Sequence, residues 1–150
     1  MSDTNRPTVD DANRLLGELF AEWVQDLNLR VEHIDADGAV LRLPQHEGIR
    51  RIGGIVCGQA SMTLIDTCMV FVCFAALGRV ADVTTVSQST SFMRAAGNGD
   101  LLATGRVLKA GRQLVFGEVT VTLDGDNRRN AGRPIAHGTS TYAVLPPRPA

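Results

Sequence analysis

This 150-residue chain has no surplus of charge of either sign, because 15 Lys and Arg residues face 16 Asp and Glu residues and leave a formal net charge of -1. Proteins that bind nucleic acids by neutralising phosphates carry a basic surplus. No block of like charges marks an interaction tail either. The composition therefore predicts that the chain has no nucleic-acid partner.

Long hydrophobic runs are also missing. The longest apolar stretch, Thr67 to Leu77, is about half the roughly 20 residues that a membrane-spanning helix needs. The polar segment Met1 to Asp11 contains no apolar region of the kind that begins an export signal. We therefore expect a cytoplasmic protein with no membrane partner.

Cysteine is scarce, and its number is odd. The three cysteines are Cys57, Cys68 and Cys73. None forms a Cys-x-x-Cys pair, which argues against both a disulfide framework and a zinc site. The three histidines show no metal-ligand spacing either. We expect no bound metal and a reducing compartment.

Helical and strand patterns alternate along the chain. Apolar residues recur with helical spacing from Val9 to Leu27, and Thr8 with Asp11 resembles a capping box at the start of this helix. Two short strand-like runs then flank an Asp37-Gly38 pair, which is typical of a hairpin turn. After a glycine-rich loop, the segment from Gly58 to about Leu77 is apolar on nearly every side, so it predicts a buried helix.

The second half of the chain is predicted to form strands. The hairpin strands run from Val31 to Asp35 and from Ala39 to Leu43, and the later strands are Val83 to Phe92, Leu101 to Lys109, Leu114 to Leu123 and Ile135 to Leu145. Short connections favour antiparallel pairing, and the simplest packing wraps the sheet around the apolar helix. We expect one α+β domain over residues 1–150, with flexible ends at residues 1–8 and 146–150.

Two features of the apolar helix suggest chemistry. A carboxylate at Asp66 is costly in such a helix unless it is hydrogen-bonded to a neighbour or used in a reaction, and both interpretations remain open. Gly58 opens the helix, where free backbone N–H groups face negative charge, so it is either an ordinary helix-start glycine or part of an oxyanion site.

These features resemble the motif of one enzyme family. The segment from Cys57 through Gly58 and Gln59 to Asp66 resembles the His-Gly-Gly-x5-(Leu/Ala)-Asp segment of phenylacetate-pathway (PaaI-type) hotdog thioesterases, with the same spacing. The segments Ser91 to Ala96, Val107 to Phe116 and Ala136 to Tyr142 resemble later motifs of that family in the right order. The resemblance covers about residues 48 to 145.

The resemblance implies a hotdog fold and an acyl-CoA thioesterase that releases free acid and CoA. It places the nucleophile or general base on Asp66, a carbonyl-polarising N–H on Gly58, and a hydroxyl that orients water or the acid on Thr85, with Ser87 as a weaker match. Gln59 is a further candidate donor to the carbonyl. No separate cofactor is implied, because coenzyme A is part of the substrate.

Further residues are expected to bind the substrate. They are Cys57, Thr63, Arg94, Lys109 and Arg112, of which the three basic residues are candidates for the phosphates of coenzyme A. Cys57 stands where the family has histidine, and Gln59 stands where it has a second glycine.

Those departures leave alternatives open. One is a hotdog protein that binds acyl-CoA without hydrolysing it, and another is a hydratase, which would need a histidine near the helix. A Cys57 nucleophile is a third, for which His46 would have to fold close. We expect a homo-oligomer, a dimer or a tetramer built as a dimer of dimers, in which the strand from Val83 to Phe92 pairs between chains and each active site is shared.

Overall fold

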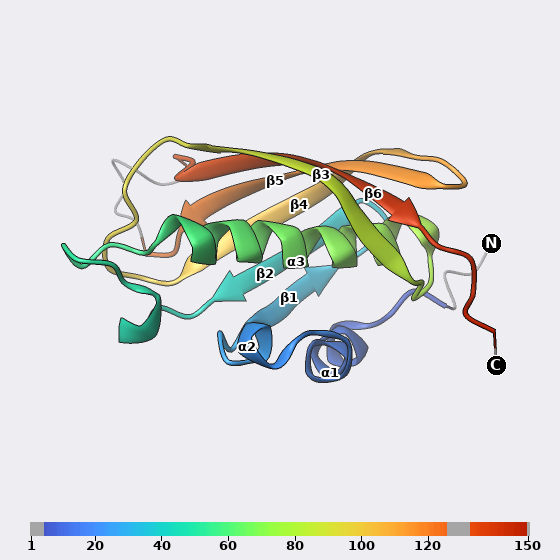
Figure 1. Cartoon of the computed structure of the whole chain (residues 1–150), viewed down its shortest axis with the longest axis horizontal. Coiled ribbons are helices and arrows are strands. Elements are labelled where there is room, and N and C mark those ends of the chain that lie inside the picture. The colour runs from blue at the N-terminus through green and yellow to red at the C-terminus, as the bar shows by residue number, and fades with distance from the viewer. Residues whose placement is uncertain (1–4, 126–132, 150) are drawn as a thin grey trace.

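A six-stranded antiparallel sheet wraps around one long helix in the structure, a computed structural model that describes residues 5–125 and 133–149 (Figure 1). The strand order is β1-β2-β4-β5-β6-β3, and every neighbouring pair is antiparallel. This is the hotdog arrangement that the sequence predicts, so the predicted fold class is confirmed.

The strand and long-helix boundaries also agree closely with the prediction. The elements are α1 (Val9–Leu19), α2 (Glu22–Gln25), β1 (Arg30–Ile34), β2 (Gly38–Leu43), the short 3-10 helix η1 (Glu47–Ile49), α3 (Gly58–Leu77), β3 (Val83–Phe92), β4 (Leu101–Ala110), β5 (Leu114–Leu123) and β6 (Ala136–Val144). The predicted flexible ends include residues 1–4 and 150, and the connection between the last two predicted strands includes residues 126–132. These parts lie outside the described residues.

The core lies between α3 and the concave face of the sheet. Leu64, Ile65, Met69 and Phe71 of α3 are fully buried, as the all-round apolar pattern predicts. By length and composition α3 could cross a membrane, but 67% of its most apolar window is buried inside the fold. Its apolar character is therefore accounted for by the core of this domain.

Glycines let α3 lie close to the sheet. A Cβ on Gly105 of β4 would come within 2.6 Å of Val72 Cγ2, and one on Gly138 of β6 within 2.8 Å of Ile65 Cγ2. Both glycines pair with Val119 of β5, so they form one row across the sheet beneath the helix. The absence of a side chain at these two glycines lets the helix lie close to the sheet.

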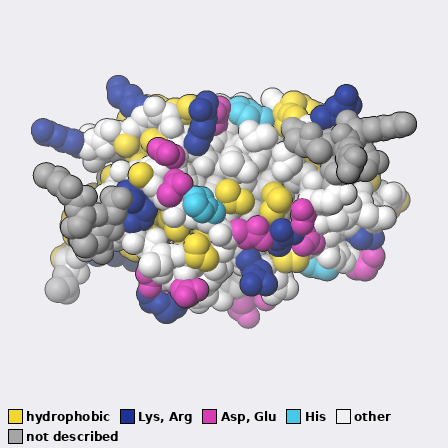
Figure 2. All heavy atoms as spheres, turned by 180° about the vertical axis from the view of Figure 1, so that it is seen from behind, with side chains coloured by type: hydrophobic (Ala, Val, Ile, Leu, Met, Phe, Trp, Pro, Cys, Tyr) yellow, Lys and Arg dark blue, Asp and Glu magenta, His cyan; other side chains and the backbone are white. Residues whose placement is uncertain are grey.

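The outer face of the sheet carries charges of both signs, which lie interspersed in Figure 2. Arg42 of β2, for example, forms ion pairs with Glu32, Asp100 (2.9 Å) and Asp124 (2.7 Å). Opposite charges on neighbouring strands suit a solvent-facing surface.

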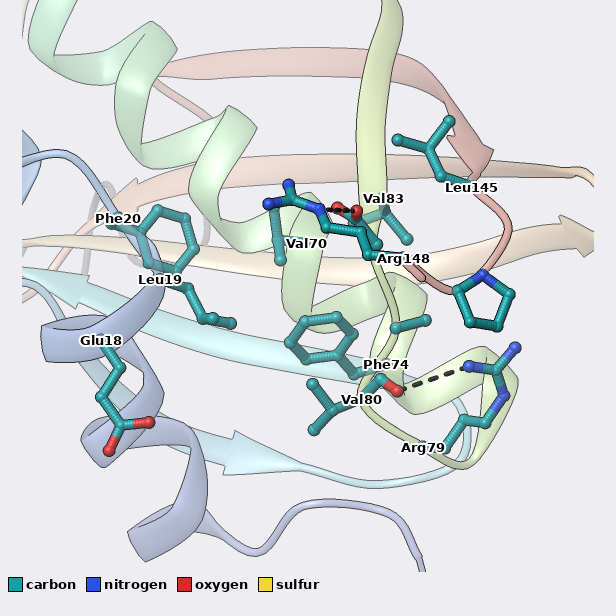
Figure 3. Close-up of a pocket in the computed structure, with 13 residues that line it drawn as sticks. Glu18, Leu19, Phe20, Val70, Phe74, Arg79, Val80, Val83, Leu145 and Arg148 are labelled. Atoms are coloured by element: carbon teal, nitrogen blue, oxygen red, sulfur yellow. Dashed lines mark hydrogen bonds and ion pairs between the residues drawn. The ribbon is translucent and has the colours of Figure 1, made fainter. Parts of the chain in front are cut away.

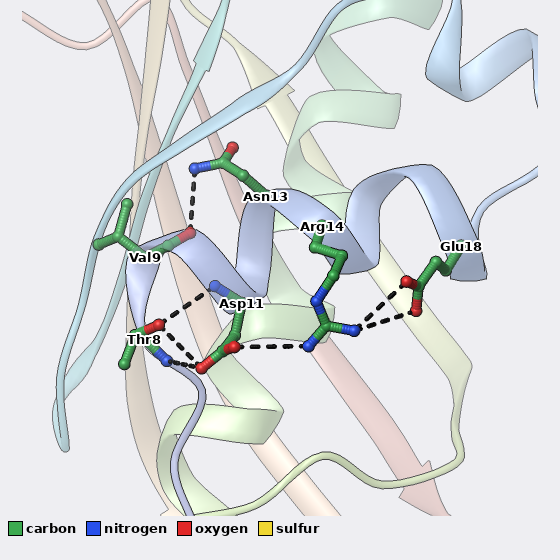
Figure 4. A network of polar contacts seen from close by, with 6 residues as sticks. All are labelled: Thr8, Val9, Asp11, Asn13, Arg14 and Glu18. Carbon is green, nitrogen blue, oxygen red and sulfur yellow. Dashed lines mark hydrogen bonds and ion pairs between the residues drawn. The ribbon is translucent and has the colours of Figure 1, made fainter.

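The N-terminal helix begins as predicted but ends early. Thr8 and Asp11 form a reciprocal capping box at the start of α1 (Figure 4). The prediction of one helix from Val9 to Leu27 is wrong, because the backbone is extended at Phe20 and Ala21 before α2 begins. The break turns the ring of Phe20 onto Phe71 of α3, with the ring centroids 5.9 Å apart.

The two edges of the sheet differ. At the β1 edge, the side-chain amide of Asn13 in α1 donates to the carbonyl of Val31 and accepts from its N–H, both at 2.9 Å. At the other edge, β3 pairs with β6 on one side and with no described strand on its outer side. Helix α1 thus protects the β1 edge, whereas β3 is left with unpaired backbone groups.

Candidate active site

Asp66 lies midway along α3 and is half-buried, on the side of the helix that the sheet leaves open. It lines a groove of about 450 Å³ together with residues from the α1–α2 region and from β3. A carboxylate is therefore tolerated in this apolar helix because it lines a groove and is not enclosed in the packed core.

Two hydroxyl groups hold one oxygen of this carboxylate. Thr85 of β3 donates to Oδ1 of Asp66 at 2.9 Å, and the hydroxyl of Tyr142 in β6 also donates to Oδ1. The Tyr142 oxygen lies 2.8 Å from the backbone carbonyl of Asp66 as well. The second oxygen, Oδ2, accepts no hydrogen bond from any described residue, so the carboxylate is oriented through one oxygen and open through the other.

Tyr142 is suited to be a permanent donor. Its side chain is buried, and burial is the main reason why its pKa lies well above the usual value, with the neighbouring Asp66 carboxylate acting in the same direction. A raised pKa keeps the phenol protonated. Tyr142 therefore donates to Asp66 over the whole physiological pH range.

An irregularity in β3 brings Thr85 to this carboxylate. The pairing of β3 with β6 shifts between Thr85 and Ser87. Further along the strand Gln88 points to the helix, where its amide donates to the carbonyl of Met62 at 3.3 Å. Simple alternation would place Val86 on this side, and the extra residue of the bulge places Thr85 there instead. Ser87, the weaker match, makes no contact with Asp66.

The start of α3 forms a second groove. It has a volume of about 410 Å³ and includes Gly58, Phe92 and Arg94. The first helical hydrogen bond is donated by Ser61 to Cys57, so the N–H groups of the three residues before Ser61 have no acceptor among the described residues. Such groups, at the positive end of the helix dipole, favour a developing negative charge.

One chain does not bring these two features together. Asp66 follows Gly58 by eight residues, about 12 Å along the helix axis, and the two residues line different grooves. Gln59 lies in the Asp66 groove although it directly follows Gly58, because successive side chains point in different directions around a helix. If both features take part in one reaction, each chain carries them as two separate half-sites.

The other expected binding residues are more dispersed. Thr63 lines the Asp66 groove, and its hydroxyl donates to the carbonyl of Gln59 at 2.9 Å. Cys57 is the half-buried residue that precedes α3. The Nε2 atom of His46 is buried and has no hydrogen-bond partner among the described residues, and its Nδ1 atom accepts from the N–H of Gly48. The His46–Cys57 pair that a thiol nucleophile would need is therefore not formed.

The three basic candidates for phosphate binding do not cluster within one chain. Arg94 lies in the Gly58 groove and donates to the backbone carbonyl of Arg133 at 2.7 Å. Lys109 and Arg112 are exposed near the tip of the β4–β5 hairpin. The tip of this hairpin lies level with the start of β3, whereas Arg94 follows the end of β3. The length of the sheet therefore separates Arg94 from Lys109 and Arg112. Their contact with coenzyme A remains a prediction.

Two residues near Asp66 were not predicted from the sequence to belong to the site. Trp23 lines the groove, and Tyr142 holds the carboxylate. Tyr142 is the only tyrosine, and a buried phenol needs an acceptor, which was a signal that some polar group lies opposite β6. Trp23, the only tryptophan, lies in the segment that was predicted to be one helix with an apolar face. Its side chain is instead 61% exposed and lines the groove, because the break after α1 turns it outward.

Comparison with known proteins gives a consistent result. The sequence profile of the thioesterase superfamily matches residues 53–129. A protein of Halobacterium salinarum, proposed to be an esterase, is 30% identical over 79% of this chain and 82% of its own length. A protein of Silicibacter sp. TM1040 whose crystal structure is described as that of a proposed thioesterase is 30% identical, with a TM-score of 0.79 over 93% of this chain and 92% of that one. Zebrafish thioesterase superfamily member 2 shares the fold, with a TM-score of 0.76 at 23% identity over 93% and 99% of the two chains.

Proposed function

This chain belongs to the thioesterase superfamily, and we propose that it hydrolyses acyl-CoA thioesters to a free acid and coenzyme A. The observation that carries the proposal is the Asp66 carboxylate, which lines a groove and which two hydroxyl groups hold through Oδ1, while Oδ2 accepts no hydrogen bond from any described residue. A carboxylate fixed in this way is preorganised as a general base or nucleophile.

The chemistry requires both a base and a site for negative charge. In the general-base form, Oδ2 takes a proton from water while the water oxygen bonds to the thioester carbonyl carbon. The carbonyl oxygen then carries the negative charge, which the free N–H groups at the start of α3 stabilise. The carbon–sulfur bond breaks, and the departing thiolate of coenzyme A takes up the proton. No cofactor takes part in these reaction steps.

The two half-sites are completed by a second copy of the chain. Attack needs reacting atoms about 3–3.5 Å apart, a distance that one helix cannot offer between Asp66 and Gly58. Pairing of two β3 edges about a two-fold axis would set the two α3 helices antiparallel. Gly58 of one chain would then lie beside Asp66 of the other. The unpaired outer edge of β3 supports this arrangement, as a dimer or as the unit of a tetramer.

The first experiment measures thiol release from a panel of acyl-CoA esters, with Asp66→Asn as the decisive variant. Asparagine keeps the shape and removes the charge, so kcat should fall by about 10²–10⁴-fold, the usual contribution of a general base. The variant should remain folded, because losing a partly buried charge often costs no stability. Asp26→Asn is the matched control, since Asp26 is exposed and outside both grooves.

Two outcomes would contradict the proposal. Near-native turnover in a folded Asp66→Asn variant would remove Asp66 from the mechanism. Quenching of Trp23 fluorescence by acyl-CoA without any thiol release would show that the protein binds acyl-CoA but does not hydrolyse it. The replacement of the family histidine by Cys57 leaves this alternative open.

A further inference from the structure

A cavity of about 690 Å³ lies next to the Asp66 groove. It opens between the end of α1, the second half of α3, the connection from α3 to β3, and the C-terminal tail (Figure 3). None of the chemistry described above uses this space, so its lining and its position need a separate explanation.

The walls of the cavity are apolar. They include Leu19, Phe20, Val70, Phe74, Val83 and Leu145. In Figure 3 the side chains of Phe20, Val70 and Phe74 face the central space, whereas Glu18 and Arg79 lie at its border. A concave apolar site with polar groups confined to its border is typical of a pocket for an apolar ligand.

Three of the four charged groups that line the cavity are in ion pairs. Asp82 pairs with Arg148 at 2.9 Å, and Glu18 pairs with Arg14 at 3.3 Å. Arg79 donates to the carbonyl of Val80 at 3.4 Å. Burying a charged group costs free energy unless it is paired, and the one charged lining group without an ion pair among the described residues, Arg79, lies at the border. The apolar walls therefore favour a hydrocarbon chain.

Three elements connect the cavity with the Asp66 groove. Phe20 lines both spaces. On α3, Val70 follows Asp66 by four residues and therefore lies on the same face of the helix, one turn further on. On β3, Val83 precedes Thr85 by two residues, so both side chains point to the same face of the strand. The apolar space thus begins where the carboxylate site ends.

We infer that this cavity receives the acyl chain of the thioester substrate. The inference rests on the proposed function and adds a substrate class, namely unbranched apolar acyl chains of medium length. From Asp66 to Phe74 the helix extends about 12 Å, which a zigzag chain with carbon–carbon bonds of about 1.5 Å spans with roughly ten carbons. Val70 lies near the entrance and Phe74 near the far end, so both determine chain length.

The test compares saturated acyl-CoA esters from two to sixteen carbons. Burial of each methylene in the cavity should raise kcat/KM by about threefold to fourfold. The increase should continue to roughly ten carbons, where the cavity ends at Phe74, and then stop. If kcat/KM does not depend on chain length beyond four carbons, the inference is wrong while the proposed thioesterase activity stands.

The second measurement uses a variant in which a larger side chain fills part of the cavity. Val70→Phe places a ring at the entrance, so the ratio of kcat/KM for decanoyl-CoA to that for butyryl-CoA should fall by about tenfold or more. Val40→Phe is the matched control, because Val40 is a half-buried valine on the outer face of the sheet. It should keep the native ratio.

Direct binding separates this inference from the proposed function. Decanoate alone, the free product, should bind the native protein and lose affinity in Val70→Phe but not in Val40→Phe, which calorimetry measures without turnover. An unchanged ratio and unchanged decanoate affinity in a folded Val70→Phe variant would overturn the inference. Absence of hydrolysis for every ester, with decanoate still bound as expected, would overturn the proposed function instead.

Discussion

The orientation of Asp66 depends on a residue 76 positions away in the sequence, Tyr142, whose hydroxyl contacts both the carboxylate and the backbone carbonyl of Asp66. Tyr142 lies on the sheet and holds the carboxylate through Oδ1, while the Asp66 side chain lines the groove. Tyr142 does not line the groove. We propose that it is a positioning residue, which orients Asp66 through Oδ1.

Tyr142→Phe removes this hydroxyl without changing the ring. A hydrogen bond to a charged group contributes about 1.5–3 kcal/mol, so kcat should fall by roughly 10–100-fold while KM stays near its native value. Unfolding in denaturant should show only a small loss of stability, because Asp66 is half-exposed and water can replace the donor. A raised KM with unchanged kcat would show that Tyr142 acts on binding and not on the carboxylate.

The residues of the site were predictable to different degrees. Asp66 stands out in the sequence because it is the only carboxylate in an otherwise apolar segment. Thr85 was named through a resemblance, and its orientation depends on a bulge that alternation alone does not reveal. The role of Tyr142 depends on long-range pairing, which a local pattern cannot encode.

At the scale of the elements, local patterns predicted most boundaries, and tertiary packing decided the exception. The capping box of α1 is a local signal and was predicted correctly. The end of α1 at Leu19 was not, because contact between Phe20 and Phe71 competes with helix continuation. Hydrophobic periodicity carries no information about such a contact.

The role of Gly105 in setting the distance between α3 and the sheet can be tested by adding one methyl group at this position. Gly105→Ala should lower the free energy of unfolding by about 1–3 kcal/mol, the usual cost of overpacking, because its Cβ would lie 2.6 Å from Val72 Cγ2 and 2.9 Å from Cys68 Sγ.

Gly17→Ala is the matched control, since nothing lies within 4 Å of a Cβ at this position in α1. It should raise stability by about 0.5–1 kcal/mol, as expected for alanine in place of a helical glycine. Equal effects of the two substitutions in chemical denaturation would show that the glycine row does not set the packing distance.

At the scale of the whole molecule, the single chain has one protected and one unprotected sheet edge, and its two half-sites lie on different parts of α3. The sequence predicted that the strand from Val83 to Phe92 pairs between chains and that each site is shared, but it did not predict that α1 protects the β1 edge. How two chains meet depends on surfaces that only an assembly brings together.

The shared site is tested most directly by mixing two inactive variants. Asp66→Ala removes the carboxylate and keeps the N–H at the start of α3. Gly58→Pro removes that N–H and is compatible with folding, because proline is favoured at the first position of a helix. Each variant alone should be inactive, since every site in it lacks one of the two groups.

Co-refolding of the two variants in equal amounts decides the question. Random pairing would place half of the chains in mixed dimers, each with one intact and one doubly defective site, so the mixture should recover about a quarter of native thioesterase activity. Subunit exchange is verified by co-purification through an affinity tag on one variant. If tagged and untagged chains co-purify and the mixture still releases no thiol, the proposal that Asp66 of one chain and Gly58 of another form one active site is contradicted.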